Sequence, residues 1–210
     1  MKKIIGISSR LTKLPYEERD SLALDWHNFF RKVLPDYSWL IIPNDKKNLQ
    51  LLCSNISFSG FILSGGDDIG LYKERDKTET FLLDYAVNNL LPLVGVCRGA
   101  QMINTYFGGS LQKFLETTHV ATKHKISLLS SYYADIDEIE VNSFHNFGIF
   151  EDTLAQCLNV FAYKNEENGQ KSIEGFIHEK LPIYGVMWHP EREKIITTLD
   201  KQFFQKIFEG

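Results

Sequence analysis

The run LVGVCRGAQ at residues 93–101 constrains the fold more than any other part of the chain. Its apolar start predicts a buried strand and its end predicts a helix, with Cys97 at the junction between Gly95 and Gly99. This is the thiol counterpart of the G-x-S-x-G nucleophile elbow. Such a turn excludes side chains beside the nucleophile, pushes the sulfur out of the surface and points a helix N-terminus at it, which favours the thiolate. We therefore predict that Cys97 is a catalytic nucleophile, whereas Cys53 and Cys157 are predicted to be inert core thiols.

The first half of the chain alternates between strand and helix patterns. Continuously apolar strands of this kind are typical of a parallel sheet that helices cover on both faces. The predicted strands are residues 4–7, 39–42, 61–63 and 93–96, and the predicted helices are residues 22–33, 78–90 and 98–107.

The second half changes character, because few helical patterns separate its strands. They are predicted at residues 125–129, 139–143, 160–163, 173–178 and 184–189, with a hairpin tip at 165–169 and a terminal helix at 195–208. The predicted fold is α/β: a mostly parallel, doubly wound sheet of flavodoxin-like type with added antiparallel strands. We expect one domain over residues 1–210.

Bulk composition excludes several classes of protein. Of the 210 residues 43% are hydrophobic, which is typical of a globular chain, and the net charge of −4 gives no reason to expect nucleic acid or a membrane surface as a partner. Three cysteines do not form a disulfide framework and fit a reducing compartment. The N-terminus lacks the apolar core of a signal peptide, and no stretch is long enough to span a membrane. We expect a cytoplasmic protein.

A second candidate group follows the strand predicted at 184–189. Pro190 ends that strand and biases His189 toward an extended backbone, in which residues two apart point the same way. His189 and Glu191 are therefore predicted to lie side by side, as a base and its orienting carboxylate for Cys97. The pair Gly65-Gly66 forms either a simple turn or, with Gly66 N–H and Arg98 N–H, an oxyanion hole. The residues alone do not choose between these two interpretations.

Four ordered motifs together resemble one family: LSGGDD at 63–68, GVCRGAQ at 95–101, VNSFH at 141–145 and HPE at 189–191. The chain resembles class I glutamine amidotransferase-like proteins, and most of all the stand-alone γ-glutamyl hydrolases of peptidase C26 type. The resemblance runs from about residue 60 to residue 191.

This resemblance implies a role for each matching residue. Cys97 would be the nucleophile, His189 the base and Glu191 its partner, with Gly66 and Arg98 as oxyanion donors. The substrate-binding residues implied by matching motifs are Gln101, Asn142, Ser143 and Phe144. The implied activity is hydrolysis of a small γ-glutamyl amide through a cysteinyl thioester, with no cofactor and no obligatory protein partner.

The leaving group is where the chain departs from its relatives. Asn146 and Phe147 stand where that branch often has a histidine and a glutamine. Arg10 and Lys73, in loops predicted at the edge that carries Cys97, form either a solvated rim or a phosphate pocket, as do Lys13 and Arg75. One kind of relative removes the glutamyl group from γ-glutamyl-CDP-amidate during capsule polysaccharide modification. This compound is our specific substrate prediction.

Two other functions remain open from the sequence. One is a glutaminase component that delivers ammonia to a partner synthetase, and the other is a non-catalytic regulatory protein on the same fold. His119 and His124 lie five residues apart, but no acidic or thiol partner stands at ligand spacing. We predict that they belong to a surface loop and strand, and we predict no metal site.

Overall fold

The structure is a computed structural model that describes residues 3–114, 119–129 and 137–209. It divides into two compact units, which we describe separately. Unit 1 comprises Met1–Leu93 with Pro190–Gly210, and unit 2 comprises Val94–His189. The single-domain organisation stays a prediction.

Unit 1 is built on parallel strands. β1 (Ile4–Ser8) lies between β4 (Ser38–Ile42) and β5 (Gly60–Leu63) and pairs with both in parallel. All four residues of β5 are buried, which explains its continuous apolar sequence. The three strands agree with the predicted positions, and the parallel arrangement predicted for this half is confirmed.

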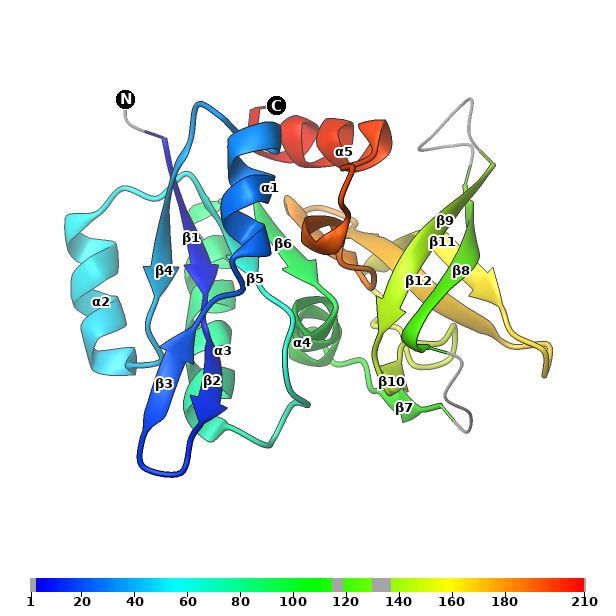
Figure 1. Ribbon diagram of the computed structural model, residues 1–210, viewed down its shortest axis with the longest axis horizontal. Coiled ribbons are helices and arrows are strands. Elements are labelled where there is room, and N and C mark those ends of the chain that lie inside the picture. The colour runs from blue at the N-terminus through cyan, green and yellow to red at the C-terminus, as the bar shows by residue number, and fades with distance from the viewer. Residues whose placement is uncertain (1–2, 115–118, 130–136, 210) are drawn as a thin grey trace. The chain divides into compact units, whose positions relative to one another are not determined.

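Helices cover both faces of these strands. In Figure 1, α1 (Asp25–Val33) lies in front of them and α3 (Lys73–Asn89) behind. α1 buries its aromatic face and contacts α5 (Thr198–Glu209), where the Phe29 and Phe204 rings meet edge to face at 4.8 Å. α3 contacts α2 (Lys46–Asn55). This is the doubly wound arrangement that the alternating pattern predicts.

Unit 1 also contains elements that the apolar pattern did not predict. A hairpin of β2 (Arg10–Lys13) and β3 (Glu18–Ser21) is polar, and α2 is mostly exposed. α2 begins at Asp45, whose carboxylate accepts the backbone N–H groups of the next turn. α3 begins five residues before the predicted residue 78, because its first turn is charged rather than apolar. Periodic apolar residues cannot reveal such segments.

Unit 2 holds the strand order β6-β13-β12-β11-β8-β9. The pairs β8–β9, β8–β11, β11–β12 and β12–β13 are all antiparallel, which confirms the predicted change of character. The bounds are β6 (Leu93–Val96), β8 (Val120–Leu128), β9 (Glu138–Phe144), β11 (Leu158–Asn165), β12 (Lys171–His178) and β13 (Ile183–Val186). A short pair, β7 (Gln112–Lys113) with β10 (Phe147–Gly148), completes the unit.

Two details of the second half of the chain correct or confirm particular predictions. β13 ends at Val186, three residues before the predicted end, and Pro190–Arg192 forms a short 3₁₀ turn (η1). The expected extended backbone through Glu191 is therefore wrong. The hairpin tip predicted at 165–169 is confirmed between β11 and β12, where the Gly169 N–H donates to the Glu166 carbonyl at 3.0 Å.

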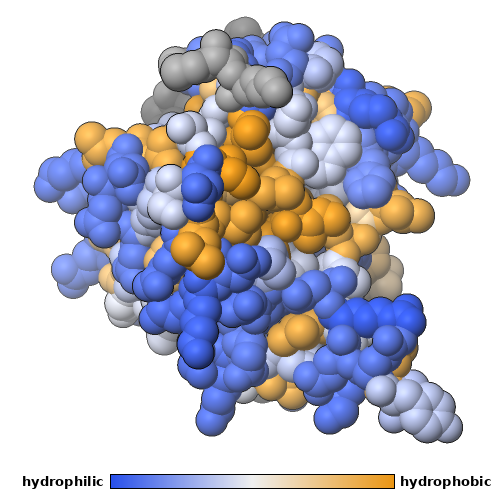
Figure 2. Space-filling model, turned by 90° about the vertical axis from the view of Figure 1, so that its left-hand side faces the viewer, coloured by the Kyte–Doolittle hydropathy of each residue, from blue (hydrophilic) through white to orange (hydrophobic). Residues whose placement is uncertain are grey.

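No helix among the described residues is long and apolar enough to cross a membrane. Figure 2 shows the face that lies at the left of Figure 1, where an apolar area is surrounded by hydrophilic side chains. Exposed apolar residues of unit 1 include Ile41 on the edge strand β4 and Leu51 on α2. Nothing in the structure shows what would cover them.

Candidate functional site

Cys97 occupies a strained turn between β6 and α4 (Arg98–Tyr106). Its backbone has φ 51° and ψ −107°, a conformation that non-glycine residues rarely adopt. A Cβ on Gly95 would lie 2.4 Å from the Gly99 backbone, so only glycine allows the strand and helix to approach this closely. The predicted elbow geometry is therefore present. The residue is only 4% exposed, so the expectation that the turn pushes the sulfur out of the surface is wrong.

Main-chain bonds connect the elbow to the strand that leads to His189. The Cys97 N–H donates to the Val186 carbonyl at 2.8 Å, at the end of β13. His189 follows three residues later in sequence and is 1% exposed. The Cys97 turn and the segment that leads to His189 thus follow two neighbouring strands, β6 and β13, and a main-chain hydrogen bond joins them.

The side chain of Asn142 on β9 forms two hydrogen bonds with the backbone of His189. Its Nδ2 donates to the His189 carbonyl at 2.8 Å, and its Oδ1 accepts the His189 N–H at 2.8 Å. Two residues along β9, the Phe144 ring meets the His189 ring edge to face at 5.6 Å. Asn142 was predicted to bind substrate, and in the structure its side-chain amide holds the backbone of His189; its substrate role stays a prediction.

The polar side chains of two other predicted substrate-binding residues also hold backbone. Gln101 Nε2 donates to the Phe147 carbonyl at 2.8 Å, and the buried Ser143 hydroxyl donates to the His119 carbonyl at 2.7 Å. Phe144 is 41% exposed. A substrate role for these residues stays a prediction.

The remaining predicted site residues, apart from Arg98, lie in unit 1. Glu191 is buried in η1, where its Oε1 lies 3.8 Å from Arg192 Nε. Arg10 begins β2, and Lys73 is the exposed first residue of α3. Gly66 belongs to unit 1 and Arg98 to unit 2. The triad and the oxyanion hole therefore stay predictions.

Arg75 is not a rim residue, contrary to its placement among the candidate phosphate-binding cations. It is 1% exposed, donates from Nε to Glu79 Oε1 at 3.0 Å and donates from Nη2 to the Ser64 and Gly65 carbonyls at 2.7 and 3.1 Å. A Cβ on Gly66 would clash with Arg75 Nη1 at 2.1 Å. Arg75 thus shapes the glycine loop instead of meeting solvent.

A small pocket of unit 1 is lined by residues from the hairpin, the glycine loop and η1. Its polar lining includes Arg10, Ser64, Glu191 and Arg192. Arg10 Nε is buried and has no hydrogen-bond partner within residues 3–114, 119–129 and 137–209, and Arg10 Nη2 lies 3.9 Å from Asp67 Oδ2. Sequence reasoning missed Arg192, although its position directly after the HPE motif could have indicated it.

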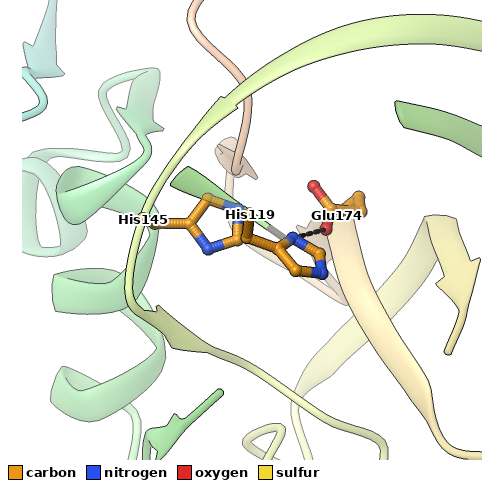
Figure 3. Close-up of side chains that lie close together, drawn as sticks. All are labelled: His119, His145 and Glu174. Carbon is orange, nitrogen blue, oxygen red and sulfur yellow. Dashed lines mark ion pairs between the residues drawn. The ribbon is translucent and has the colours of Figure 1, made fainter. Parts of the chain in front are cut away.

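His119 and His124 are not surface residues, because their side chains are 0% and 8% exposed. They lie with His145 and Glu174 in a buried polar cluster of unit 2, shown in part in Figure 3. Glu174 was missed although a single carboxylate within the apolar run of β12 is an unusual pattern. An acidic partner is therefore available in space, although none stands at ligand spacing in the sequence.

Burial and hydrogen bonds set the protonation states of His145 and of Glu166, which lies beside the cluster. Burial dominates for His145. Burial lowers the pKa of His145 to about 4, which keeps that imidazole neutral near pH 7. Burial alone would raise the pKa of Glu166, but hydrogen bonds from His119, Lys164 and Ser172 outweigh it and lower that pKa to about 2.

Cys53 and Cys157 are free and partly exposed rather than core thiols. Burial raises the pKa of both, so each thiol is less readily ionised than an ordinary cysteine. Neither has the glycine-flanked turn of Cys97.

Known proteins resemble this chain over nearly its whole length. It is 33% identical to the γ-glutamyl-CDP-amidate hydrolase of Campylobacter jejuni subsp. jejuni serotype O:2, over 98% of this chain and 99% of that protein. It is 31% identical to the glutamine-hydrolyzing GMP synthase subunit of Methanococcus vannielii, over 69% and 70% of the two chains.

Solved structures show the same fold. A GMP synthase subunit from Thermoplasma acidophilum gives a TM-score of 0.72 at 24% identity, covering 100% of this chain and 94% of that one. The glutaminase domain of Trypanosoma brucei CTPS gives 0.70 at 12% identity, covering 99% and 94%. The predicted glutamine amidotransferase-like fold is thereby confirmed.

The peptidase C26 family matches residues 4–191, which include the whole Cys97 elbow and the His189-Pro190-Glu191 segment. The chain therefore belongs to the peptidase C26 family and is a cysteine-dependent hydrolase.

Proposed function

We propose that this protein hydrolyses a γ-glutamyl amide through a thioester on Cys97, and that its substrate is γ-glutamyl-CDP-amidate. The products would be glutamate and CDP-amidate. The observation that carries the chemistry is the strained elbow at Cys97, which the Gly95–Gly99 approach maintains. A strained backbone conformation persists only where the surrounding structure enforces it, and residues with such strain cluster at active sites. The substrate is supported by the nearly end-to-end similarity to a hydrolase of that name.

The first half of the proposed reaction transfers the glutamyl group to the enzyme. The Cys97 thiolate adds to the γ-carbonyl carbon, and backbone N–H groups of Gly66 and Arg98 stabilise the resulting oxyanion. The carbon–nitrogen bond then breaks, and His189 gives its proton to the departing nitrogen. Glu191 orients the imidazole for this transfer.

The second half restores the free enzyme. Neutral His189 takes a proton from water, and the hydroxide adds to the thioester carbon. The carbon–sulfur bond breaks, which releases glutamate and regenerates the thiolate. The two hydrogen bonds between Asn142 and the backbone of His189 support the assignment of His189 as the base, because a base must keep its position through both proton transfers.

The pocket of unit 1 supports a phosphorylated leaving group. It brings together the guanidinium groups of Arg10 and Arg192 beside Glu191, the proposed orienting carboxylate. Guanidinium groups bind phosphate oxygens with two parallel hydrogen bonds, and the Arg10 Nε donor is available for one. We assign the diphosphate of the leaving group to the mouth of this pocket, whose interior of about 20 Å³ is too small to enclose it, with Lys73 as an outer cation.

We further propose that the enzyme acts in the cytoplasm, without a cofactor or an obligatory protein partner. A cysteine nucleophile needs a free thiol, and all three cysteines are free. A second function, delivery of ammonia to a synthetase partner, is favoured by the similarity to glutamine-hydrolyzing GMP synthase subunits.

Glutamate release from three substrates tests these proposals: γ-glutamyl-CDP-amidate, an unphosphorylated γ-glutamyl amide and glutamine. We expect the first to have the highest kcat/KM, and a glutamyl adduct on Cys97 in intact-protein mass spectra. Cys97→Ala should lose at least about 1,000-fold in kcat, whereas the matched variant Cys157→Ala should retain its activity. Near-normal release by Cys97→Ala would end the thioester mechanism.

The leaving group and the rival function need separate arms of the experiment. Arg10→Ala should raise KM for the phosphorylated substrate by about 10-fold or more and leave the unphosphorylated amide unaffected. Equal effects on both substrates would overturn the phosphate assignment. Glutamine hydrolysis that appears only after a synthetase is added would favour the ammonia-delivering function instead.

A further inference from the structure

A buried cluster of three side chains in unit 2 presents donor atoms to one common point. His119 precedes β8, His145 follows β9 and Glu174 lies on β12, and all three are at most 4% exposed. Their candidate donor atoms lie within 4.8 Å of one another. Figure 3 shows the two imidazoles and the carboxylate gathered together, with His119 Nδ1 3.9 Å from Glu174 Oε1.

Three buried atoms of these side chains have no hydrogen-bond partner among the described residues. They are His119 Nδ1, His145 Nε2 and Glu174 Oε2. Both ring nitrogens of His124 also lack a hydrogen bond, and His124 Nε2 lies 3.6 Å from Glu174 Oε1. A buried polar atom left unsatisfied has lost its hydrogen bonds to water without replacing them, so several at one place indicate a missing ligand.

The opposite nitrogen of each imidazole is held by an acceptor. His119 Nε2 lies 3.0 Å from Glu166 Oε1, and His145 Nδ1 lies 3.1 Å from the Phe147 carbonyl. Metal-binding histidines show this arrangement, because an acceptor on one ring nitrogen fixes the tautomer that leaves the other free to coordinate.

Additional contacts hold the Glu166 carboxylate and the His119 ring in place. Ser172 donates to Glu166 Oε1 at 2.6 Å, and Lys164 forms an ion pair with the same carboxylate. The Phe114 ring stacks on His119 with centroids 3.9 Å apart. The side chains around the open atoms are thus already oriented.

We propose that His119, His145 and Glu174 bind one divalent transition-metal ion of the zinc type, with His124 available as a fourth ligand. Two imidazoles and one carboxylate form a donor set that Zn²⁺ commonly accepts. A divalent charge would also compensate the buried carboxylate. Tetrahedral Zn²⁺ with bonds of about 2 Å places its ligands roughly 3.3 Å apart, so donor atoms that lie up to 4.8 Å apart must approach by up to about 1.5 Å.

The role of this ion is structural. It would join the chain before β8, the chain after β9 and the middle of β12, which are far apart in sequence. The Phe147 carbonyl that holds His145 also accepts Gln101 of α4, the helix that starts at the nucleophile. The His119 carbonyl accepts the Ser143 hydroxyl, next to the residue that grips His189. The ion would therefore brace the segments that position both catalytic side chains.

Metal binding by the full-length protein tests the site without any substrate. Cys97→Ala protein, which lacks the nucleophilic thiol as a rival ligand, is stripped with a chelator and titrated with Zn²⁺ or Co²⁺. We expect about one bound ion per chain by elemental analysis, and a visible Co²⁺ spectrum of four-coordinate nitrogen and oxygen ligands. Zn²⁺ should also raise Tm.

Variants locate the ion. Glu174→Gln and His145→Gln should each weaken binding by at least about 100-fold, and Glu166→Gln by about 10-fold to 100-fold through its support of His119. His27→Gln, on a helix of unit 1, is the matched control and should bind normally. Equal binding by all variants would show adventitious sites only and overturn the proposal.

Binding of less than about 0.1 ion by the stripped, refilled parent protein would overturn it as well. This outcome needs no variant, so poor folding of Glu174→Gln cannot leave the proposal undecided. Its failure would not affect the hydrolase mechanism, since the glutamate-release experiment is independent of added metal.

Discussion

The Arg75–Glu79 pair of unit 1 and the histidine cluster of unit 2 bury charged side chains in different ways. In unit 1, Glu79 Oε1 accepts hydrogen bonds from Arg75 and Ser8, and Arg75 also donates to the carbonyls of the glycine loop. In unit 2, the neighbouring side chains of His145 and Glu174 carry buried atoms that have no hydrogen-bond partner in the part of the chain that the structure describes. A satisfied buried network stabilises a fold by itself, whereas an unsatisfied one indicates a ligand. Perturbing each network in turn therefore tests whether this difference is real.

The largest effect on stability is expected in unit 1. Arg75→Leu removes one partner of a buried ion pair and leaves Glu79 uncompensated, which should cost about 3–5 kcal/mol in the free energy of unfolding. Urea denaturation measures the loss, and added Zn²⁺ should not restore it. Lys171→Leu, which breaks the exposed pair with Glu151, is the control and should change little. Equal losses in both variants would contradict the comparison.

Acid should destabilise the metal-free protein through unit 2. The folded pKa of His145, about 4, lies below the value of about 6.5 in an unfolded chain. As pH falls the unfolded state takes up the proton first, so this contribution is complete above about pH 6.5. It decreases between about pH 6.5 and 4, to a total loss of roughly 3 kcal/mol.

Unfolding titrations at several pH values measure this loss. His145→Gln should flatten the curve over the same interval, while His27→Gln should leave it unchanged. A wild-type stability that stays constant between pH 6.5 and 4 would mean that His145 is not held neutral by burial.

A smaller effect should appear in activity when a satisfied buried residue of unit 2 is removed. Asn142→Ala loses both hydrogen bonds to the backbone of His189, and we expect kcat to fall by about 10–100-fold with little change in KM. Asn142→Asp keeps the acceptor but places a carboxylate oxygen against the His189 carbonyl, so its kcat should be no higher than that of Asn142→Ala. The shape of the pH–rate profile of Asn142→Ala should persist, because the base itself is unchanged.

Asn159→Ala, at an exposed position of β11, is the matched control for this measurement. If Asn142→Ala raised KM alone, its side chain would bind substrate as the motif first implied, and the positioning role would be wrong. Normal metal binding by Asn142→Ala would show that Asn142 is not required for the proposed metal site.

Local patterns predicted much of the fold because their physical cause is local. Buried parallel strands such as β1 and β5 are continuously apolar, and α1 shows its aromatic face at helical spacing. The polar β2–β3 hairpin and the charged first turn of α3 were missed, because their residues satisfy hydrogen bonds and charges rather than burying an apolar stripe. The end of β13 was misplaced, since Pro190 begins a 3₁₀ turn instead of closing a longer strand.

The sequence by itself determined the nucleophile elbow, because Gly95, Cys97 and Gly99 are close along the chain and their spacing fixes the turn. Only the tertiary structure decided the roles of residues distant in sequence. Asn142 turned out to hold His189 across 47 positions, Arg75 to support the glycine loop, and His119 to meet His145 and Glu174. Strand order and register create these contacts, and no local spacing encodes them.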